Sequence, residues 1–160
     1  MSTRPEHKAA RLPRLLALPM AVVPASFHAA VAVTALNHAL AVQLARDELD
    51  FLAGRRVMLD VQDANIKLLL TVTDTALAAA GGDPDLVVRG TLYDFLLLAA
   101  RREDPDTLFF QRRLHMEGDT ELGLGLKNFL AALDEDEVAL LRPLDFLLKR
   151  SLPVYQRLFG

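Results

Sequence analysis

The chain has 160 residues, enough for one domain that buries roughly 70% of its unfolded surface around a single core. It contains no cysteine, which excludes disulfides, thiolate catalysis and cysteine-ligated metal sites on this chain. Its net charge is −3, whereas proteins that bind nucleic acids typically carry a basic surface. No nucleic-acid partner is therefore expected.

The first 23 residues are basic and interrupted by prolines. Four basic side chains between residues 4 and 14 precede the apolar run 15–23, an order that mimics a secretory signal. Against that interpretation, prolines break the apolar run and no clean small-x-small cleavage site follows it. No stretch offers the ~20 uninterrupted apolar residues of a membrane span. We therefore expect residues 1–23 to lie on a membrane surface.

Residues 15–45 contain no Asp, Glu, Lys or Arg. Ser26 suits the start of a helix that continues to Ala45, with apolar side chains on every side. Such a helix is either buried on two sides or faces a ligand or a bilayer. His28 and His38 lack metal-ligand spacing and are expected on this helix as partly buried polar residues.

Strand periodicity replaces helical periodicity at Arg56. Alternating apolar residues predict strands over 56–62, 66–72, 76–80 and 86–89. The turns between the first three are too short for a parallel crossover, which predicts antiparallel pairing. Thr91 then caps a helix through Ala100, and a fifth strand is predicted from Phe110 to Glu117.

Asp119 caps the next predicted helix, whose apolar stripe ends at Leu133. Gly123 and Gly125 within it each cost about 1 kcal/mol relative to Ala. A helix keeps such residues where its backbone closely approaches a neighbouring strand or a ligand. Residues 134–160 form a predicted amphipathic helical tail, which either folds back over the core or serves as a lid or membrane contact.

No catalytic constellation emerges from the sequence. The serines lack the Gly-x-Ser-x-Gly elbow, and the glycine pair at 81–82 lacks the lysine of a phosphate loop. The acidic clusters occupy a proline turn at 104–106 and a helix start at 134–137. We therefore expect no enzymatic activity, no cofactor and no metal.

Several motifs carry a family resemblance. They are Asp-Pro-Asp-Thr-Leu-Phe-Phe-Gln-Arg-Arg-Leu at 104–114, Glu-Gly-Asp-Thr-Glu-Leu-Gly-Leu at 117–124, Lys127-Asn128, Leu36-Asn37, and Glu-Leu-Asp-Phe-Leu at 48–52. On these motifs and the order of elements, the chain resembles the sterol carrier protein lipid-binding fold. It more closely resembles the UbiT family of ubiquinone-biosynthesis accessory factors, from about Pro13 to Leu133.

The resemblance implies a sterol-carrier-like α+β domain over residues 24–133, with a five-stranded, mainly antiparallel sheet and helices packed on one face. It implies a non-enzymatic carrier of isoprenoid quinone intermediates or phospholipid. The carrier would present the intermediates to UbiU and UbiV, which hold the iron–sulfur chemistry for hydroxylation without dioxygen. A cytoplasmic protein in peripheral contact with the inner membrane is then expected.

A polyprenyl tail needs a dry tunnel between helix and sheet, because each buried methylene contributes about 0.8 kcal/mol. The candidate lining residues are Phe95, Leu98, Leu114, Met116, Leu122, Leu126 and Phe129. Ordinary core packing is the alternative for all of them. The rival function is an interaction module with a filled core that docks to a partner protein or an anionic membrane surface. A hydrolase or isomerase acting on the lipid would need an ionisable residue facing the tunnel, and the sequence identifies none.

Overall fold

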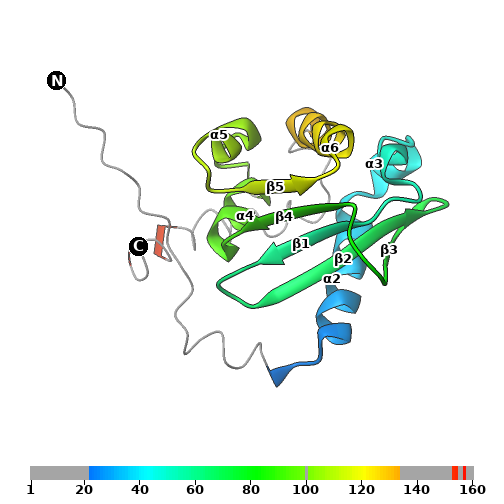
Figure 1. The fold of residues 1–160 in the computed structure, drawn as a ribbon, viewed down its shortest axis with the longest axis horizontal. Coiled ribbons are helices and arrows are strands. Elements are labelled where there is room, and N and C mark those ends of the chain that lie inside the picture. The colour runs from blue at the N-terminus through cyan, green and yellow to red at the C-terminus, as the bar shows by residue number, and fades with distance from the viewer. Residues whose placement is uncertain (1–21, 100, 134–152, 155–156, 158–160) are drawn as a thin grey trace.

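The computed structural model describes residues 22–99, 101–133, 153–154 and 157, and their arrangement is drawn in Figure 1. The strands are β1 (Val57–Val61), β2 (Ile66–Thr73), β3 (Ala76–Ala79), β4 (Leu86–Gly90) and β5 (His115–Gly118). The helices are α2 (Ala25–Ala39), α3 (Ala41–Ala45), the 3-10 helix η1 (Asp50–Leu52), α4 (Leu92–Ala99), α5 (Pro105–Phe110) and α6 (Thr120–Ala132). Residues 1–21 and nearly all of the predicted tail lie outside the described residues.

The five strands form one sheet in the order β3-β2-β1-β4-β5. Three of the four pairings are antiparallel, and β1 pairs with β4 in parallel, with Val57 opposite Leu86. Asn65 and Asp74 have positive φ in the two hairpin turns, a conformation that Asn and Asp tolerate better than most residues. The mainly antiparallel five-stranded sheet predicted from the sequence is confirmed.

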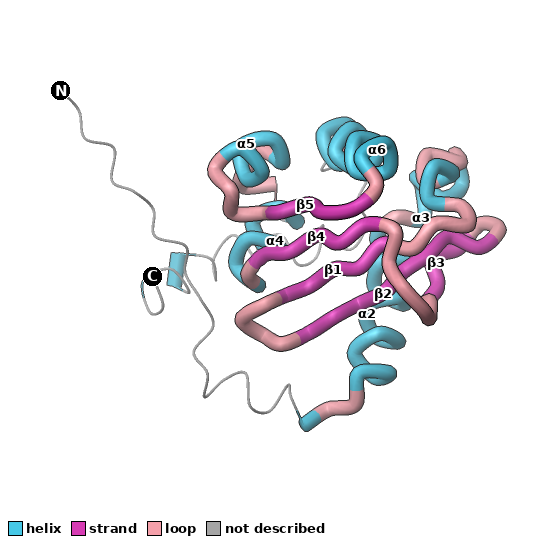
Figure 2. Tube along the Cα trace, viewed as in Figure 1, coloured by secondary structure: helices cyan, strands magenta, loops and turns pink. Residues whose placement is uncertain are grey.

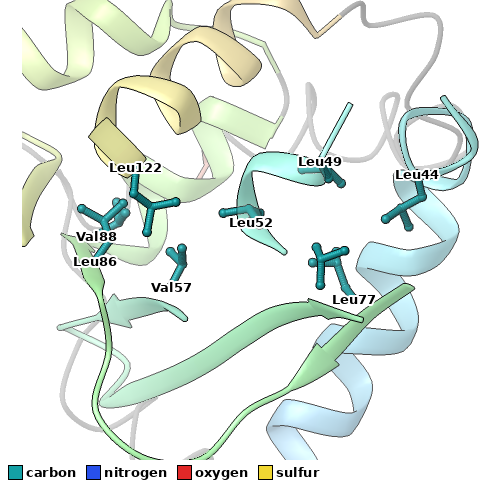
Figure 3. Packing of buried hydrophobic residues seen from close by; sticks show 9 residues of the cluster. Leu44, Leu49, Leu52, Val57, Leu77, Leu86, Val88 and Leu122 are labelled. Atoms are coloured by element: carbon teal, nitrogen blue, oxygen red, sulfur yellow. The ribbon is translucent and has the colours of Figure 1, made fainter. Parts of the chain in front are cut away.

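The helices pack on one face of the sheet, as expected (Figure 2). Between this face and the helices lies the larger hydrophobic cluster (Figure 3), formed by Leu44, Leu49, Leu52, Val57, Val72, Leu77, Leu86, Val88 and Leu122. A second cluster of Tyr93, Leu97, Leu108 and Leu114 joins α4 to α5 and the chain entering β5. The side chains of alternate strand residues supply the sheet side of the core, which explains the period of two in the sequence.

Helix α2 runs beside the edge strand β3. The side-chain amide of Asn37 donates to the Leu77 carbonyl at 2.9 Å, and the Leu77 N–H donates to Asn37 Oδ1 at 2.8 Å. The outer N–H and C=O groups of an edge strand have no neighbouring strand to pair with. The Asn37 carboxamide satisfies both of these groups at Leu77, as a further strand would. Only Ala39 of α2 is buried, so the part of the chain that the structure describes covers this helix on one side rather than two.

Two elements differ from the sequence-based prediction. The long helix expected to reach Ala45 breaks at Leu40, where φ is −103° and ψ is 19°, and thus becomes α2 and α3. The strand predicted from Phe110 begins at His115, because Phe110 is the last residue of α5 and residues 111–114 form turns and bends. The Asp104 carboxylate caps α5 by accepting from the Thr107 N–H at 3.2 Å, while a proline occupies the first turn.

The two histidines of α2 also differ from each other. His28 is half-buried, as predicted, whereas His38 is exposed because it lies on the side of α2 away from the sheet. No helix in the described ranges has both the length and the apolarity needed to cross a bilayer.

Candidate functional site

An open groove of about 590 Å³ lies where η1 and the chain leading into it meet the last turns of α6. Its lining residues are Arg46, Glu48, Phe51, Gly125, Asn128, Phe129 and Ala132. This volume falls within the range of about 300–1,000 Å³ that is usual for small-molecule sites. The groove therefore has room for a substantial part of a small ligand.

Two aromatic rings form the apolar part of the groove. The centroids of Phe51 in η1 and Phe129 in α6 are 6.0 Å apart, with the ring planes tilted by 47°. Both rings are half-buried and pack against the larger hydrophobic cluster. The apolar surface of the groove is thus continuous with the core beneath it.

Gly125 allows α6 to approach Phe51 closely. A Cβ added at Gly125 would lie 3.0 Å from Phe51 Cδ2, so the ring would have to move. A Cβ at Gly123 would instead meet Met116 Sδ at 3.5 Å and Leu86 Cδ1 at 3.6 Å, which are ordinary contact distances. The two helix glycines thus face different neighbours: Gly123 faces the sheet, and Gly125 faces η1 and the groove.

The rim of the groove is polar. Arg46 Nη1 lies 3.8 Å from Glu48 Oε1, and the two side chains are 55% and 41% exposed. Such an exposed pair stabilises the fold little, so both groups can exchange this contact for a ligand at small cost. Asn128 adds an exposed amide. The groove therefore combines an aromatic interior with hydrogen-bonding groups at its edge.

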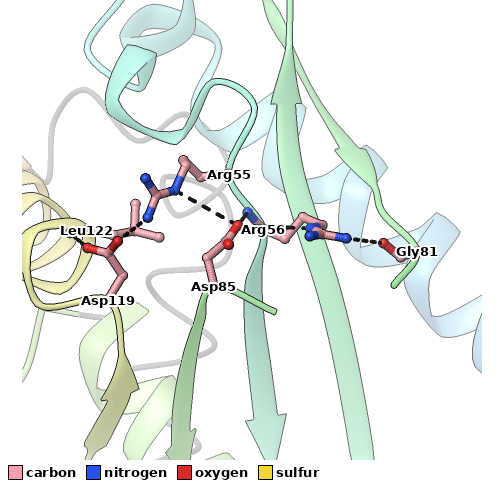
Figure 4. A network of polar contacts seen from close by, with 6 residues as sticks. All are labelled: Arg55, Arg56, Gly81, Asp85, Asp119 and Leu122. Atoms are coloured by element: carbon pink, nitrogen blue, oxygen red, sulfur yellow. Dashed lines mark hydrogen bonds and ion pairs between the residues drawn. The ribbon is translucent and has the colours of Figure 1, made fainter. Parts of the chain in front are cut away.

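A polar network holds the start of α6 in place (Figure 4). Asp119 Oδ1 accepts from the Leu122 N–H at 2.9 Å, and the other carboxylate oxygen pairs with Arg55. Arg55 also lies 3.9 Å from Asp85, which accepts from the Arg56 N–H at 2.8 Å. This network joins the α6 N-terminus to the chain between η1 and β1, which fixes one wall of the groove relative to the other.

The network shifts two pKa values. The bond from the Leu122 N–H, and then the bond from Arg55, lower the pKa of Asp119 below its usual range. The hydrogen bond to Asp119 raises the pKa of Arg55. Both shifts favour the charged forms, so the pair is fully ionised near neutral pH.

A buried ion pair secures the second cluster. Asp94 is 1% exposed, pairs with Arg113 and accepts from Thr91 Oγ1 at 2.7 Å. The Arg113 guanidinium lies 5.7 Å from the Tyr93 ring centroid, and burial raises the pKa of that tyrosine. These groups lie outside the groove lining and tie the first turn of α4 to the chain entering β5.

The groove lining places no buried ionisable side chain where it could act as a general acid or base. Its ionisable lining groups, Arg46 and Glu48, are both exposed at the rim. Within the residues that the structure describes, no group of three or more His, Asp or Glu side chains could hold a metal ion. The arrangement is suited to binding an amphipathic molecule.

The residues predicted to line a tunnel occupy several environments. Phe129 lines the groove, while Met116 and Leu126 are half-buried against the larger cluster. The remaining candidates are Leu122, which is buried in the larger cluster; Phe95, which packs against both clusters; and Leu98 and Leu114, which belong to the second. The structure thus brings five of the seven to the larger cluster and separates Leu98 and Leu114 from it.

The sequence-based candidates omitted Phe51, although Phe51 lies in one of the family motifs. The useful signal was Gly125, a glycine inside a helix, which marks a close approach. Its partner could not be inferred from helix periodicity, because Phe51 lies in a different and distant segment of the chain.

The chain matches the model of the SCP-2 sterol transfer family over residues 36–131. It is 36% identical over 127 residues to "Ubiquinone biosynthesis accessory factor UbiT" of Escherichia coli strain K12, and the match covers 79% of this chain and 73% of that protein. The protein of the same description from Escherichia coli O157:H7 matches equally well.

A solved structure described as "UbiJ-SCP2 Ubiquinone synthesis protein" has a similar fold. It matches with a TM-score of 0.54 and 17% identity, over 66% of this chain and 90% of that one. The family model, the sequence identity and the similar fold all point to the same family. This chain belongs to the SCP-2 sterol transfer family, within which it is a relative of the UbiT accessory factors.

Proposed function

We propose that this protein is a non-enzymatic accessory factor that holds isoprenoid quinone precursors for dioxygen-independent ubiquinone biosynthesis. The groove is the observation that carries the proposal, because its aromatic interior and polar rim suit a molecule with an apolar tail and a small polar head. The role in ubiquinone biosynthesis stated for the UbiT relatives supports the choice of ligand. Phospholipid, which has the same division into head and tails, is the alternative cargo.

In this proposal, the head group lies at the rim and the isoprenoid tail enters the apolar layer. Arg46 and Asn128 can donate hydrogen bonds to ring oxygens, while Phe51 and Phe129 contact the first isoprene units. The half-buried Met116 and Leu126 adjoin the same cluster and are the proposed continuation of the lining. Each buried methylene of the tail would contribute about 0.8 kcal/mol.

The proposal extends to location and partners. A carrier of such precursors would work in the cytoplasm, in peripheral contact with the inner membrane from which its cargo comes. It would present the cargo to UbiU and UbiV. Copurification of tagged UbiU or UbiV with this protein under anaerobic conditions tests that step, and failure to copurify with either would contradict it.

A tryptophan substitution tests whether the apolar layer accepts a ligand. The chain has no Trp, and Leu126→Trp places an indole beside the larger cluster. If ligand space adjoins Leu126, the melting temperature should be retained while the content of copurified lipid falls. In packed core, the same change should cost about 1–3 kcal/mol of unfolding free energy.

Leu114→Trp is the matched control, because Leu114 is 1% exposed inside the second cluster. It should destabilise the protein. Equal destabilisation by both variants, with unchanged lipid content for Leu126→Trp, would favour an interaction module with a filled core.

A further inference from the structure

The charged groups of the groove lining are evenly divided between the two signs. Arg46 carries the positive charge and Glu48 the negative charge, and the other lining residues are uncharged. Arg46 Nη1 lies 3.8 Å from Glu48 Oε1, so each side chain offsets much of the field of the other. The rim thus offers hydrogen-bonding groups without an excess of positive charge.

Acidic residues dominate the chain segment that carries this pair. Residues 46–51 contain three carboxylates against one guanidinium. Two of these carboxylates, Asp47 and Asp50, are exposed and adjoin the lining residues in the chain. In α6, Lys127 does not offset them, because its ammonium group lies 3.2 Å from the carboxylate of Asp106 in α5. An anion that approaches the rim therefore meets more negative than positive charge.

Hydrogen bonds fix the backbone that carries Glu48. Its N–H donates to the Gln43 carbonyl at 3.0 Å, and the Asp47 N–H donates to the Leu44 carbonyl at 3.2 Å. Asp47 has a φ of 57°, the left-handed conformation that commonly follows the end of a helix, which here is α3. The main chain therefore keeps Glu48 at the rim, so a ligand head group has to be compatible with its carboxylate.

We propose that this pair makes the groove select a neutral, hydroxyl-bearing head group over a carboxylate or phosphate head group, with Glu48 as the specificity-determining residue. This inference rests on the proposed function, because it concerns the head group of the lipid in the same groove. A phenolic O–H donates to the Glu48 carboxylate, while the phenolic oxygen accepts from Arg46 or Asn128.

An anionic head group lacks this fit. It can accept from Arg46 only by taking the place of Glu48, whose carboxylate then lies beside it as an unpaired like charge. A neutral head group leaves the Arg46–Glu48 attraction in place or substitutes a hydrogen bond for it. Of the candidate cargoes, the pair therefore favours a neutral phenol over an anionic phospholipid.

Two matched probes test the charge preference on the full chain freed of copurified lipid. The probes para-octylphenol and para-octylbenzoate share a ring and a tail, and near neutral pH only the benzoate is charged. Isothermal titration calorimetry at low ionic strength should show that the phenol binds about fivefold or more tightly. Added salt should narrow this affinity ratio, because it screens charges at an exposed rim.

Variants of the pair should move the ratio in opposite directions. Glu48→Gln keeps an accepting oxygen but removes the negative charge, so the benzoate should bind about fivefold more tightly and the phenol nearly as before. Arg46→Gln should widen the ratio by weakening the benzoate. Glu117→Gln is the matched control, because Glu117 is 73% exposed and alternates along β5 with Met116, which packs on the larger cluster. It should leave the ratio unchanged.

The outcomes distinguish this inference from the proposed function. An unchanged ratio in Glu48→Gln, or an equal change in Glu117→Gln, would overturn the selectivity while leaving the groove as a lipid site. Binding of neither probe would contradict the carrier function itself, and with it the selectivity. Each variant changes an exposed side chain, so thermal melts should match that of the wild type.

Discussion

At the scale of single residues, the buried pair of Asp94 and Arg113 should be the most sensitive electrostatic contact. Removing one partner leaves an uncompensated charge, so Arg113→Met should lower the unfolding free energy by about 3–5 kcal/mol. Urea denaturation measures the difference. Arg112→Met is the control, since Arg112 is exposed beside it, and should change the unfolding free energy by no more than about 0.5 kcal/mol. Similar losses of unfolding free energy in Arg113→Met and Arg112→Met would show that the buried ion pair contributes no more to stability than an exposed arginine does.

Asp119 should make the unfolding free energy depend on pH in the acid range. Its pKa is lowered in the folded protein, chiefly by the Leu122 N–H and then by Arg55. The stabilisation is therefore complete above the ordinary carboxyl pKa of about 4, and is lost as the pH falls through the lower folded value. Asn also caps helices, so Asp119→Asn should keep the cap but lose this dependence.

Denaturation at neutral pH and near pH 3 measures that dependence. The gap in unfolding free energy between wild type and Asp119→Asn should narrow at the lower pH. A gap that stays constant would mean that the ionisation of Asp119 contributes nothing to stability.

At the scale of elements, the strands were predictable because burial repeats every two residues. Val57 and Leu59 of β1 face the helices, so their alternation with neighbours on the other face is visible in the sequence. Helix α5 was not predicted, because its six residues make fewer than two turns, which is too short for an apolar residue pattern to repeat at helical spacing. The alternation from Arg112 to Met116 then suggested a longer strand. Asp104 followed by Pro105 was the available signal for the start of that helix.

The groove was only partly predictable for a related reason. Periodicity correctly placed Phe129 on the apolar side of α6. Of the two mid-helix glycines, Gly125 marks a close approach, whereas a Cβ at Gly123 would meet only ordinary contacts. Neither signal identifies the facing element, since Phe51 comes from η1. Contacts between distant segments depend on tertiary packing, which a pattern within one segment does not contain.

The glycines of this region should respond in opposite ways to Ala. Gly123→Ala should raise the unfolding free energy by up to about 1 kcal/mol, because the helix gains propensity and the new Cβ meets only ordinary contacts. Gly118→Ala should lower it by more than about 1 kcal/mol. At Gly118, φ is +126° and a Cβ would lie 2.3 Å from the Asp85 carbonyl oxygen. Thermal denaturation of both variants checks the contrast, and a stabilised Gly118→Ala would refute the stated geometry.

At the scale of the whole molecule, the proposed ligand site and the stability of the fold share one core. The sheet and the two clusters supply stability, and the groove between η1 and α6 adjoins the larger cluster through Phe51 and Phe129. Asn37 joins α2 to the sheet edge through both backbone groups of Leu77. A substitution in the groove lining must therefore be assessed for its effect on stability as well as on lipid content.

The central claim is that the groove holds an isoprenoid lipid, and mass spectrometry of lipid extracted from natively purified protein tests it most directly. Wild type and Gly123→Ala should both contain a prenylated aromatic compound. Gly125→Leu should be folded but depleted of it, because the new side chain displaces Phe51 and fills the groove. Wild-type protein without lipid, or Gly125→Leu with the wild-type amount, would contradict the claim.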